Sequence, residues 1–259
     1  MTRSVRCAAL LLSGTLLAAG CASVPRDPAA RAEFKANNDP VEPLNRRIFA
    51  FNLFFDRILI KPLAKGYVRI VPKAGRTAIR HFLDNLDEPI VLANTFLQGR
   101  PKAAATAGGR FLDNTLFGFA GLADVATGDR LHKQFGDFGQ TLWSWGLPEG
   151  PYLVVPLFGP TNPRDGIGSG VDIYIDPFRY VARSNDYATD FSIGRAVADG
   201  IDKRADSLDA LDEIQRESID YYASFRSYFR QHRTSEVKNG WPAAAQPQAP
   251  AGFYEDPGR

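Results

Sequence analysis

The chain has 259 residues, of which 31 are Lys or Arg and 29 are Asp or Glu, so its formal net charge is only +2. So small a net charge, with no basic run, argues against nucleic acid as a partner. Two cysteines and three histidines provide little for a disulfide framework or a histidine-rich metal site.

The first twenty residues have the pattern of a secretory signal. Arg3 and Arg6 form a basic start, and Ala8 to Leu17 is an apolar stretch too short to span a bilayer. The segment ends in Leu-Ala-Ala-Gly directly before Cys21, which resembles the bacterial lipobox. The alternative is an ordinary signal peptide beside an accidental cysteine. We expect residues 1–20 to be removed and Cys21 to carry the lipid anchor.

A lipidated Cys21 has consequences for location and stability. Two or three acyl chains hold a protein firmly on a membrane, and residues 21–38 are polar and rich in Pro and Ala, as expected of a tether. Ala22 and Ser23 follow without an aspartate, which by analogy with lipoprotein sorting favours the periplasmic side of the outer membrane. Because Cys7 leaves with the signal, we expect no disulfide in the mature chain.

Leu44 to Ile60 is predicted to be an amphipathic helix. At helical spacing its large apolar residues fall in an arc of about 140°. They are Leu44, Ile48, Phe51, Phe54, Phe55, Ile58 and Leu59. Asn45, Asn52 and Asp56 form a narrow polar stripe, with Arg46 and Arg57 beside it. These charges argue against a simple membrane-spanning helix. Two interpretations remain: a helix in the core of a soluble domain, or one in the apolar edge of a membrane with its stripe facing an interior path.

Prolines at 62, 72, 89 and 101 predict a series of short helices, since proline is tolerated only in a first helical turn. The expected helices are Pro62 to Ile70, Lys73 to Leu83, Glu88 to Gln98 and Lys102 to Leu116. Asp87 is the expected N-cap of the third. The carboxylates of Asp84, Asp87 and Glu88 are interpreted as solvated helix ends and caps. Gly108 and Gly109 predict close packing of the fourth helix against another helix.

The centre of the chain, residues 118–170, is rich in glycine and proline. Helices are expected only at Asp137 to Gly146 and Asp165 to Asp176, with one short strand at Tyr152 to Val155. Gly146, Gly150 and Pro151 form a turn before that strand. This turn is either a moving gate or a rigid surface hairpin.

The C-terminal part, Asp186 to Arg233, is predicted to form two helices divided near Asp206 and Ser207. Apolar and aromatic residues recur at helical spacing in the second piece, which indicates structural packing. From Thr234 onward, Ala, Pro and Gln dominate, so we expect residues 234–259 to be a disordered tail after a single domain at residues 39–233.

The chain carries no recognisable catalytic set. His81, His132 and His232 lie far apart, without the spacing of zinc-binding helices. The segment Gly166 to Gly170 places its serine out of register for a nucleophile elbow. No phosphate-binding loop is present either. We therefore predict no enzyme activity, no metal and no cofactor.

Several motifs together resemble the MlaA (VacJ) lipoproteins of Gram-negative outer membranes. They stand at residues 39–46, 49–52, 85–89, 94–99, 110–115, 138–142, 150–152 and 159–160. The similarity runs in order from about Asn38 to Arg233. In this chain Pro148 stiffens the turn before Gly150.

The resemblance implies an all-α, single ring-like helical domain embedded in the inner leaflet of the outer membrane, with at most one short β-hairpin. It implies that mislocalised phospholipid passes from the outer leaflet through an amphipathic channel to a soluble periplasmic lipid carrier, often beside a trimeric porin.

The seven apolar residues of Leu44 to Ile60 are then interpreted as membrane-facing. The stripe becomes a channel or headgroup path, and Gly146, Gly150 and Pro151 a possible gate hairpin. The alternative is a structural envelope lipoprotein that scaffolds complexes without moving lipid; an anchored hydrolase has less support.

Overall fold

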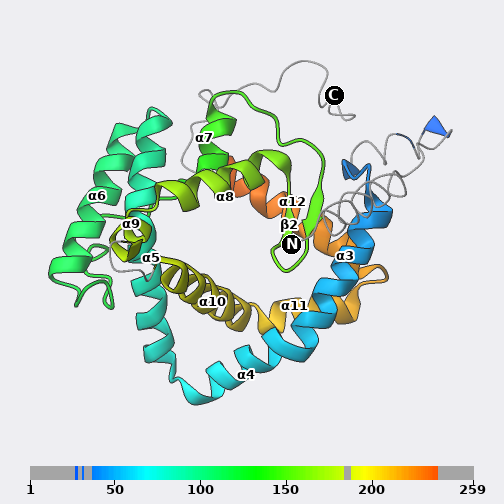
Figure 1. The fold of residues 1–259 in the computed structure, drawn as a ribbon, viewed down its shortest axis with the longest axis horizontal. Helices are drawn as coiled ribbons and strands as arrows, with labels where there is room; N and C mark the ends of the chain where they lie inside the picture. Colours follow the sequence, from blue (N-terminus) through cyan, green and yellow to red (C-terminus); the bar gives the residue numbers. More distant parts are fainter. Residues whose placement is uncertain (1–26, 29–30, 32–36, 184–187, 239–259) are drawn as a thin grey trace, which may run out of the picture.

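The computed structural model describes residues 27–28, 31, 37–183 and 188–238. In this part of the chain the fold is all-α apart from one two-stranded hairpin, as the resemblance implies. The helices follow one another round a ring (Figure 1). Cys21 and the signal segment lie outside the described residues. No helix in the described part is both long enough and apolar enough to cross a membrane.

The predicted amphipathic helix is one stretch of a longer rod. Helix α3 (Glu42–Phe55) continues through a π-helical turn, η1 (Asp56–Ile60), into α4 (Lys61–Ile70). In the π turn the N–H of Lys61 donates to the carbonyl of Asp56, five residues back. Pro62 lies in the first turn of α4, and the wider turn before it lets the rod continue where a new helix was expected.

The two helices predicted at Lys73 to Leu83 and Glu88 to Gln98 are a single helix, α5 (Lys73–Leu97), with Pro89 inside it. The predicted break and the N-cap at Asp87 are therefore wrong. An interior proline costs a helix about 3 kcal/mol. Packing offsets that cost here, because α5 lies along α6 (Pro101–Leu116), and Glu88 pairs with Arg110 of α6 at 2.7 Å.

The predicted close approach at the glycine pair of α6 is confirmed. A Cβ on Gly108 would lie 2.9 Å from Leu92 of α5, so no larger residue fits there without a shift. A Cβ on Gly109 would meet Leu131 at 3.1 Å, which belongs to the long loop after α6 rather than to another helix. Because Gly108 has no side chain, α6 can lie close to α5 at this point.

The centre folds into a short helix, a hairpin and a longer helix. Asp137 caps α7 (Phe138–Ser144) by accepting from the N–H of Gln140, at 2.8 Å. Asn162 caps α8 (Pro163–Ile175) by accepting from the N–H of Asp165, at 2.9 Å. Between them β1 (Leu153–Val155) pairs antiparallel with β2 (Gly159–Thr161). The predicted strand is confirmed, whereas β2 was not predicted.

The predicted C-terminal part contains three helices rather than two in the described residues, α10 (Ala188–Asp206), α11 (Leu208–Glu217) and α12 (Tyr221–Lys238). A further helix, α9 (Pro177–Arg183), precedes this part of the chain. The predicted division at Asp206 and Ser207 is confirmed, and a second one separates α11 from α12. Helix α12 continues past the boundary predicted at Thr234; the rest of the predicted tail, from residue 239, lies outside the described residues.

The apolar core is small and aromatic. Phe49 of α3 lies 5.4 Å, ring centre to ring centre, from each of Tyr221, Tyr222 and Phe225 of α12. Tyr152 and Val154 of the hairpin complete the cluster. This core fastens α3, the hairpin and α12 together on one side of the ring.

Candidate functional site: an apolar exterior and a polar cavity

Large apolar side chains stand on the outside of many helices and loops. The most exposed include Ile70, Leu116, Phe117, Phe119, Phe158, Tyr174 and Ile219. Soluble monomers rarely expose so much apolar surface, and extensive patches mark contact with a membrane or a partner.

The seven residues predicted to face the membrane divide into two groups. Phe51, Phe54, Ile58 and Leu59 are exposed, with Phe54 at 57%. Leu44 and Phe55 are half-buried, and Ile48 packs against the aromatic core. The exposed four lie on the second half of α3 and on η1, where the rod leaves the core. Their side chains are available to lipid, whereas that of Ile48 contributes to the fold.

Two members of the predicted polar stripe clamp the hairpin. Asn45, which is 1% exposed, donates to the carbonyl of Tyr152 at 3.0 Å and accepts from the N–H of Val154 at 2.9 Å. Two helical turns later Asn52 repeats the arrangement: it donates to the carbonyl of Val155 at 3.0 Å and accepts from the N–H of Leu157 at 2.8 Å. A side-chain amide suits both tasks because it carries a donor and an acceptor. The i, i+7 asparagines thus fix the hairpin backbone along α3.

The charged members of the stripe are mostly engaged in ion pairs. Asp56 accepts from Arg204 of α10 at 2.8 and 3.0 Å. Arg46 pairs with Glu42 at 2.7 Å and with Asp220 at 2.6 Å. Arg57 is exposed. A headgroup path along this stripe stays a prediction, with Arg57 its most accessible cation.

A buried cluster around Asp39 joins both ends of the described chain. The carboxylate of Asp39 accepts from Asn45 at 2.7 Å, from Arg226 at 2.8 Å and from the hydroxyl of Tyr222. Asp39 and Arg226 are both buried, and a buried ion pair is tolerated when its remaining lone pairs are satisfied, as they are here.

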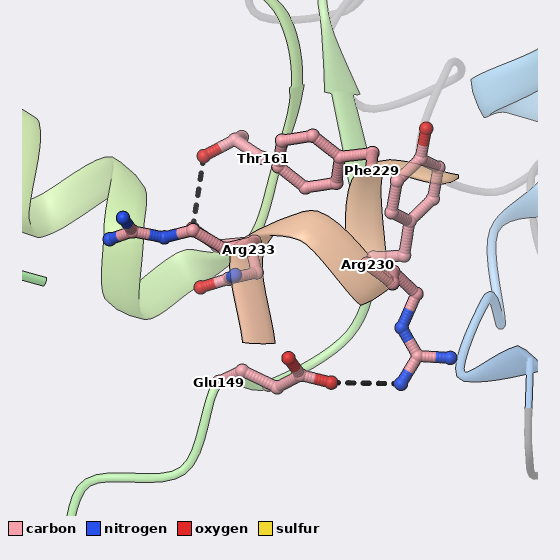
Figure 2. Close-up of a pocket in the computed structure, with 8 residues that line it drawn as sticks. Glu149, Thr161, Phe229, Arg230 and Arg233 are labelled. Atoms are coloured by element: carbon pink, nitrogen blue, oxygen red, sulfur yellow. Dashed lines mark hydrogen bonds and ion pairs between the residues drawn. The ribbon is translucent and has the colours of Figure 1, made fainter. Parts of the chain in front are cut away.

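Arg233 of α12 is the centre of a second ionic cluster. Its guanidinium donates to Asp137 before α7 and to Asp165 of α8, at distances between 2.8 and 3.0 Å. Burial alone would raise the pKa of the Asp165 carboxyl, but the Arg233 hydrogen bond and charge hold it below its ordinary value. Figure 2 shows Arg233 pointing towards one side of α12, while Arg230 extends the other way to Glu149.

The predicted gate turn is fastened on both sides. Gly146 and Gly150 have positive φ angles of 88° and 75°, which explains the two glycines. Asn38 donates to the carbonyl of Gly150 at 2.6 Å, and Glu149 pairs with Arg230 at 2.9 Å. Movement of this turn would break those contacts. A gate at Gly146, Gly150 and Pro151 stays a prediction.

A small cavity of about 10 Å³ lies where the hairpin meets α12 (Figure 2). The hydroxyl of Tyr152 is buried there and has no hydrogen-bond partner in the described part of the chain. The volume corresponds to about one water molecule.

A larger cavity of about 390 Å³ lies where α5, α7, α8, α10 and α12 approach one another. Most of its lining residues are polar or charged, although apolar atoms contribute more than half of its exposed wall. The lining residues include six carboxylates, Asp84, Asp87, Glu88, Asp137, Asp172 and Glu236, against three cations, Lys133, Lys203 and Arg233. The apolar part comes from Ile90, Val91 and Phe135. The expectation that Asp84, Asp87 and Glu88 are helix ends is wrong, because they lie within α5. Glu88 is also buried, whereas Asp84 and Asp87 remain in contact with solvent.

Burial shapes the electrostatics of the cavity. It raises the pKa of Asp172 to about 6, although the N–H of Phe138 and the amide of Asn94 favour the charged form. Burial also raises the pKa of Glu88, against the opposing effect of Arg110. Asp172 and Lys203 were not predicted as site residues, because only the tertiary fold brings their helices to α5.

The described residues contain no group of three or more His, Cys, Asp or Glu side chains arranged to hold a metal ion. The cavity therefore offers hydrogen bonds, charges and apolar surface. These are the elements of a binding site or passage.

Comparison with known proteins identifies the family. The family model for the MlaA lipoprotein matches residues 37–236. The chain belongs to the MlaA lipoprotein family. An MlaA relative from Escherichia coli, named an intermembrane phospholipid transport system lipoprotein, is 34% identical over 233 residues, which cover 88% of this chain and 87% of that protein.

Other relatives and a solved structure agree with the MlaA assignment. A Haemophilus influenzae protein of the same name is 34% identical, covering 78% of this chain and 80% of its own length. An uncharacterised Rickettsia felis protein is 35% identical, covering 77% and 78%. A structure described as the basis for maintenance of bacterial outer membrane lipid asymmetry matches with a TM-score of 0.68 and 33% identity, covering 77% of this chain and 98% of that one. The family description is that of a lipoprotein rather than of an enzyme.

Proposed function

We propose that the chain is an outer-membrane lipoprotein, anchored at Cys21 on the periplasmic side, that removes mislocalised phospholipid from the outer leaflet. It passes the lipid to a soluble periplasmic carrier for retrograde transport and so maintains lipid asymmetry. In this proposal the ring sits in the inner leaflet beside a trimeric porin. The names of the E. coli and H. influenzae relatives support a role in intermembrane phospholipid transport.

The observation that carries the proposal is the pairing of an apolar exterior with a polar cavity. Moving a phospholipid with about thirty methylenes into water would cost on the order of 24 kcal/mol, at about 0.8 kcal/mol per methylene. A transfer protein must therefore keep the tails in contact with apolar surface and still admit the headgroup. The exposed residues of α3 and η1 offer the first surface, and the charged cavity offers the second.

Surface-exposed phospholipid in a strain lacking the gene is the decisive measurement. We expect its level to rise on deletion, to return to normal with the wild-type gene, and to stay high with a Cys21→Ala copy that retains an ordinary signal peptide. An unchanged level on deletion would exclude the transport function.

A cavity variant separates transport from scaffolding. Gln134 lines the cavity and bonds only the nearby carbonyl of His132 in the described residues, so Gln134→Trp narrows the space without breaking the buried clusters. If the protein transports lipid, the Gln134→Trp variant should raise the level of surface-exposed phospholipid while the amount of the variant protein stays normal. The control Gln231→Trp changes an exposed residue of α12 outside the cavity lining and is expected to behave as wild type. Normal surface phospholipid with Gln134→Trp would favour a scaffold.

A further inference from the structure

The cations that line the large cavity are neutralised by carboxylates. Lys133 pairs with Asp84 at 2.7 Å, and Lys203 pairs at 2.7 Å with Asp199, which is not itself part of the lining. Arg233 is shared among three carboxylates, Asp137, Asp165 and Glu236, and the first and last of these line the cavity. The cavity therefore presents little positive charge to a ligand.

Five of the six lining carboxylates are ion-paired as well, and Asp172 is the exception among the described residues. Asp172 accepts from two neutral donors, the amide of Asn94 at 2.7 Å and the N–H of Phe138 at 2.9 Å, and no ion pair to it is found in the described residues. A carboxylate in this environment is stabilised by a nearby cation, and burial has already raised its pKa to about 6.

Glu88 gives an independent sign of a missing hydrogen-bond donor. It lines the cavity and is only 2% exposed. Its Oε1 accepts from Arg110 at 2.7 Å, but its Oε2 has no hydrogen-bond partner within the described part of the chain. A buried carboxylate oxygen without a donor is costly. A ligand that brings N–H donors and positive charge would satisfy it.

We propose that the cavity receives the ammonium group of a phospholipid headgroup, so that the protein prefers amine-bearing lipids to lipids whose headgroup is only anionic. This inference rests on the proposed transport function and names its substrate class. The lining has six carboxylates against three cations, and this excess of negative charge disfavours a headgroup with net negative charge, while a zwitterionic headgroup presents its ammonium to Asp172 and Glu88. Charge-assisted hydrogen bonds are the strong interactions in such a partly desolvated site.

The test uses the full-length lipoprotein in detergent, with bound lipids counted by native mass spectrometry. Phosphatidylethanolamine, its N-acetylated form and phosphatidylglycerol, all with the same acyl chains, are supplied in equal amounts. N-acetylation removes the ammonium and leaves the phosphate and tails. We expect phosphatidylethanolamine to bind about tenfold better than either of the other two lipids. This ratio corresponds to the binding free energy of one hydrogen bond to a charged group. Equal binding of the three would overturn the inference without touching the transport function, whereas failure of all three to bind would contradict the transport function itself.

A variant pair assigns the preference to the cavity. Asp172→Asn keeps the size of the side chain and one acceptor oxygen but removes the charge, and it should abolish most of the preference. Asp209→Asn makes the same change on an exposed residue of α11 outside the cavity lining and should leave the preference intact. If Asp172→Asn retains the full preference, the assignment to this cavity is wrong. If it fails to fold, the comparison of the three lipids on the wild type still decides.

A soluble amine is the other source of the same chemistry. Free ethanolamine, added in excess over the lipid, should displace little phosphatidylethanolamine, because it lacks the tails that the apolar surface holds. Displacement at concentrations similar to those of the lipid would reassign the cavity to a soluble amine.

Discussion

The exposed surface and the buried interior of the protein differ in a way opposite to that of a soluble globular protein. On the surface, Ile70 and Phe119 are each 80% exposed and Phe158 is 87% exposed. Inside, the largest fully buried side chains are polar: Asn45, Asn94, Thr95, Thr141 and Asp39. Hydrogen bonds and ion pairs therefore hold the interior, while apolar surface remains for the surroundings. This contrast is expected of a protein whose exposed surface faces lipid rather than water.

The largest effect is expected where the interior loses a charge. Arg233→Ala leaves the carboxylates of Asp137 and Asp165 without their shared partner. Because breaking a buried pair leaves an uncompensated charge, the free energy of unfolding should fall by about 3–5 kcal/mol. Denaturant unfolding of the detergent-solubilised protein measures it, with Arg230→Ala, whose pair with Glu149 is more exposed, as the milder control. A loss below about 1 kcal/mol would show that the cluster contributes little.

The hairpin clamp should rank next. Asn45→Ala leaves the carbonyl of Tyr152 and the N–H of Val154 unpaired in a buried site, at a cost of about 2–3 kcal/mol. Asn52→Ala removes the same type of contact from a half-buried site and should cost about 1 kcal/mol. Hydrogen exchange of the hairpin amides should speed up in both variants, and more for Asn45. Equal effects would mean that burial does not set the strength of the clamp.

The raised pKa of Asp172 in the cavity should make the free energy of unfolding depend on pH. The folded pKa of Asp172, about 6, lies above its ordinary value of 3.8. Between pH 4 and pH 6 the unfolded state therefore binds fewer protons, so the free energy of unfolding falls as the pH rises through this window. For a partly buried group we expect a loss of about 1–2 kcal/mol relative to Asp172→Asn. Parallel pH profiles of the two proteins would contradict the raised pKa.

The smallest effect on stability is expected outside. Phe54→Glu changes an exposed residue of α3 and should alter the free energy of unfolding by at most about 0.5 kcal/mol. Its effect should instead appear in membrane fractionation of a Cys21→Ala protein, where the charged residue lowers retention in the membrane fraction. Arg57→Glu, on the same rod, is the charged control. Unchanged retention of Phe54→Glu would mean that this face does not enter lipid.

The apolar arc of α3 and η1 was predictable from the sequence because helical periodicity is local. Phe51, Phe54 and Ile58 of this arc are exposed, whereas Leu44, Ile48 and Phe55 are half-buried, and contact of the arc with a membrane stays a prediction. The same logic did not show that Asn45 and Asn52 bind the hairpin, because their partners are about a hundred residues away. The available signal was two asparagines seven residues apart on one side of an amphipathic helix.

The interior was less predictable, because its elements meet only in the fold. Pro89 predicted a helix break, yet packing on α6 and the Glu88–Arg110 pair keep α5 continuous. Motif residues such as Asn94, Gln98 and Thr141 prove to be buried and mutually hydrogen-bonded. These three residues form a buried polar network that reaches the cavity through the hydrogen bond of Asn94 to Asp172.

Photocrosslinking from inside and outside the ring tests the central contrast most directly. A photoreactive residue at position 54 reports on the exterior, one at position 134 on the cavity, and one at position 209 on an exposed polar site. In cells with labelled phospholipid we predict crosslinks from positions 54 and 134 and none from 209. Phospholipid crosslinked from 54 but never from 134 would contradict the account, because the protein would then sit in the membrane without taking lipid into its cavity.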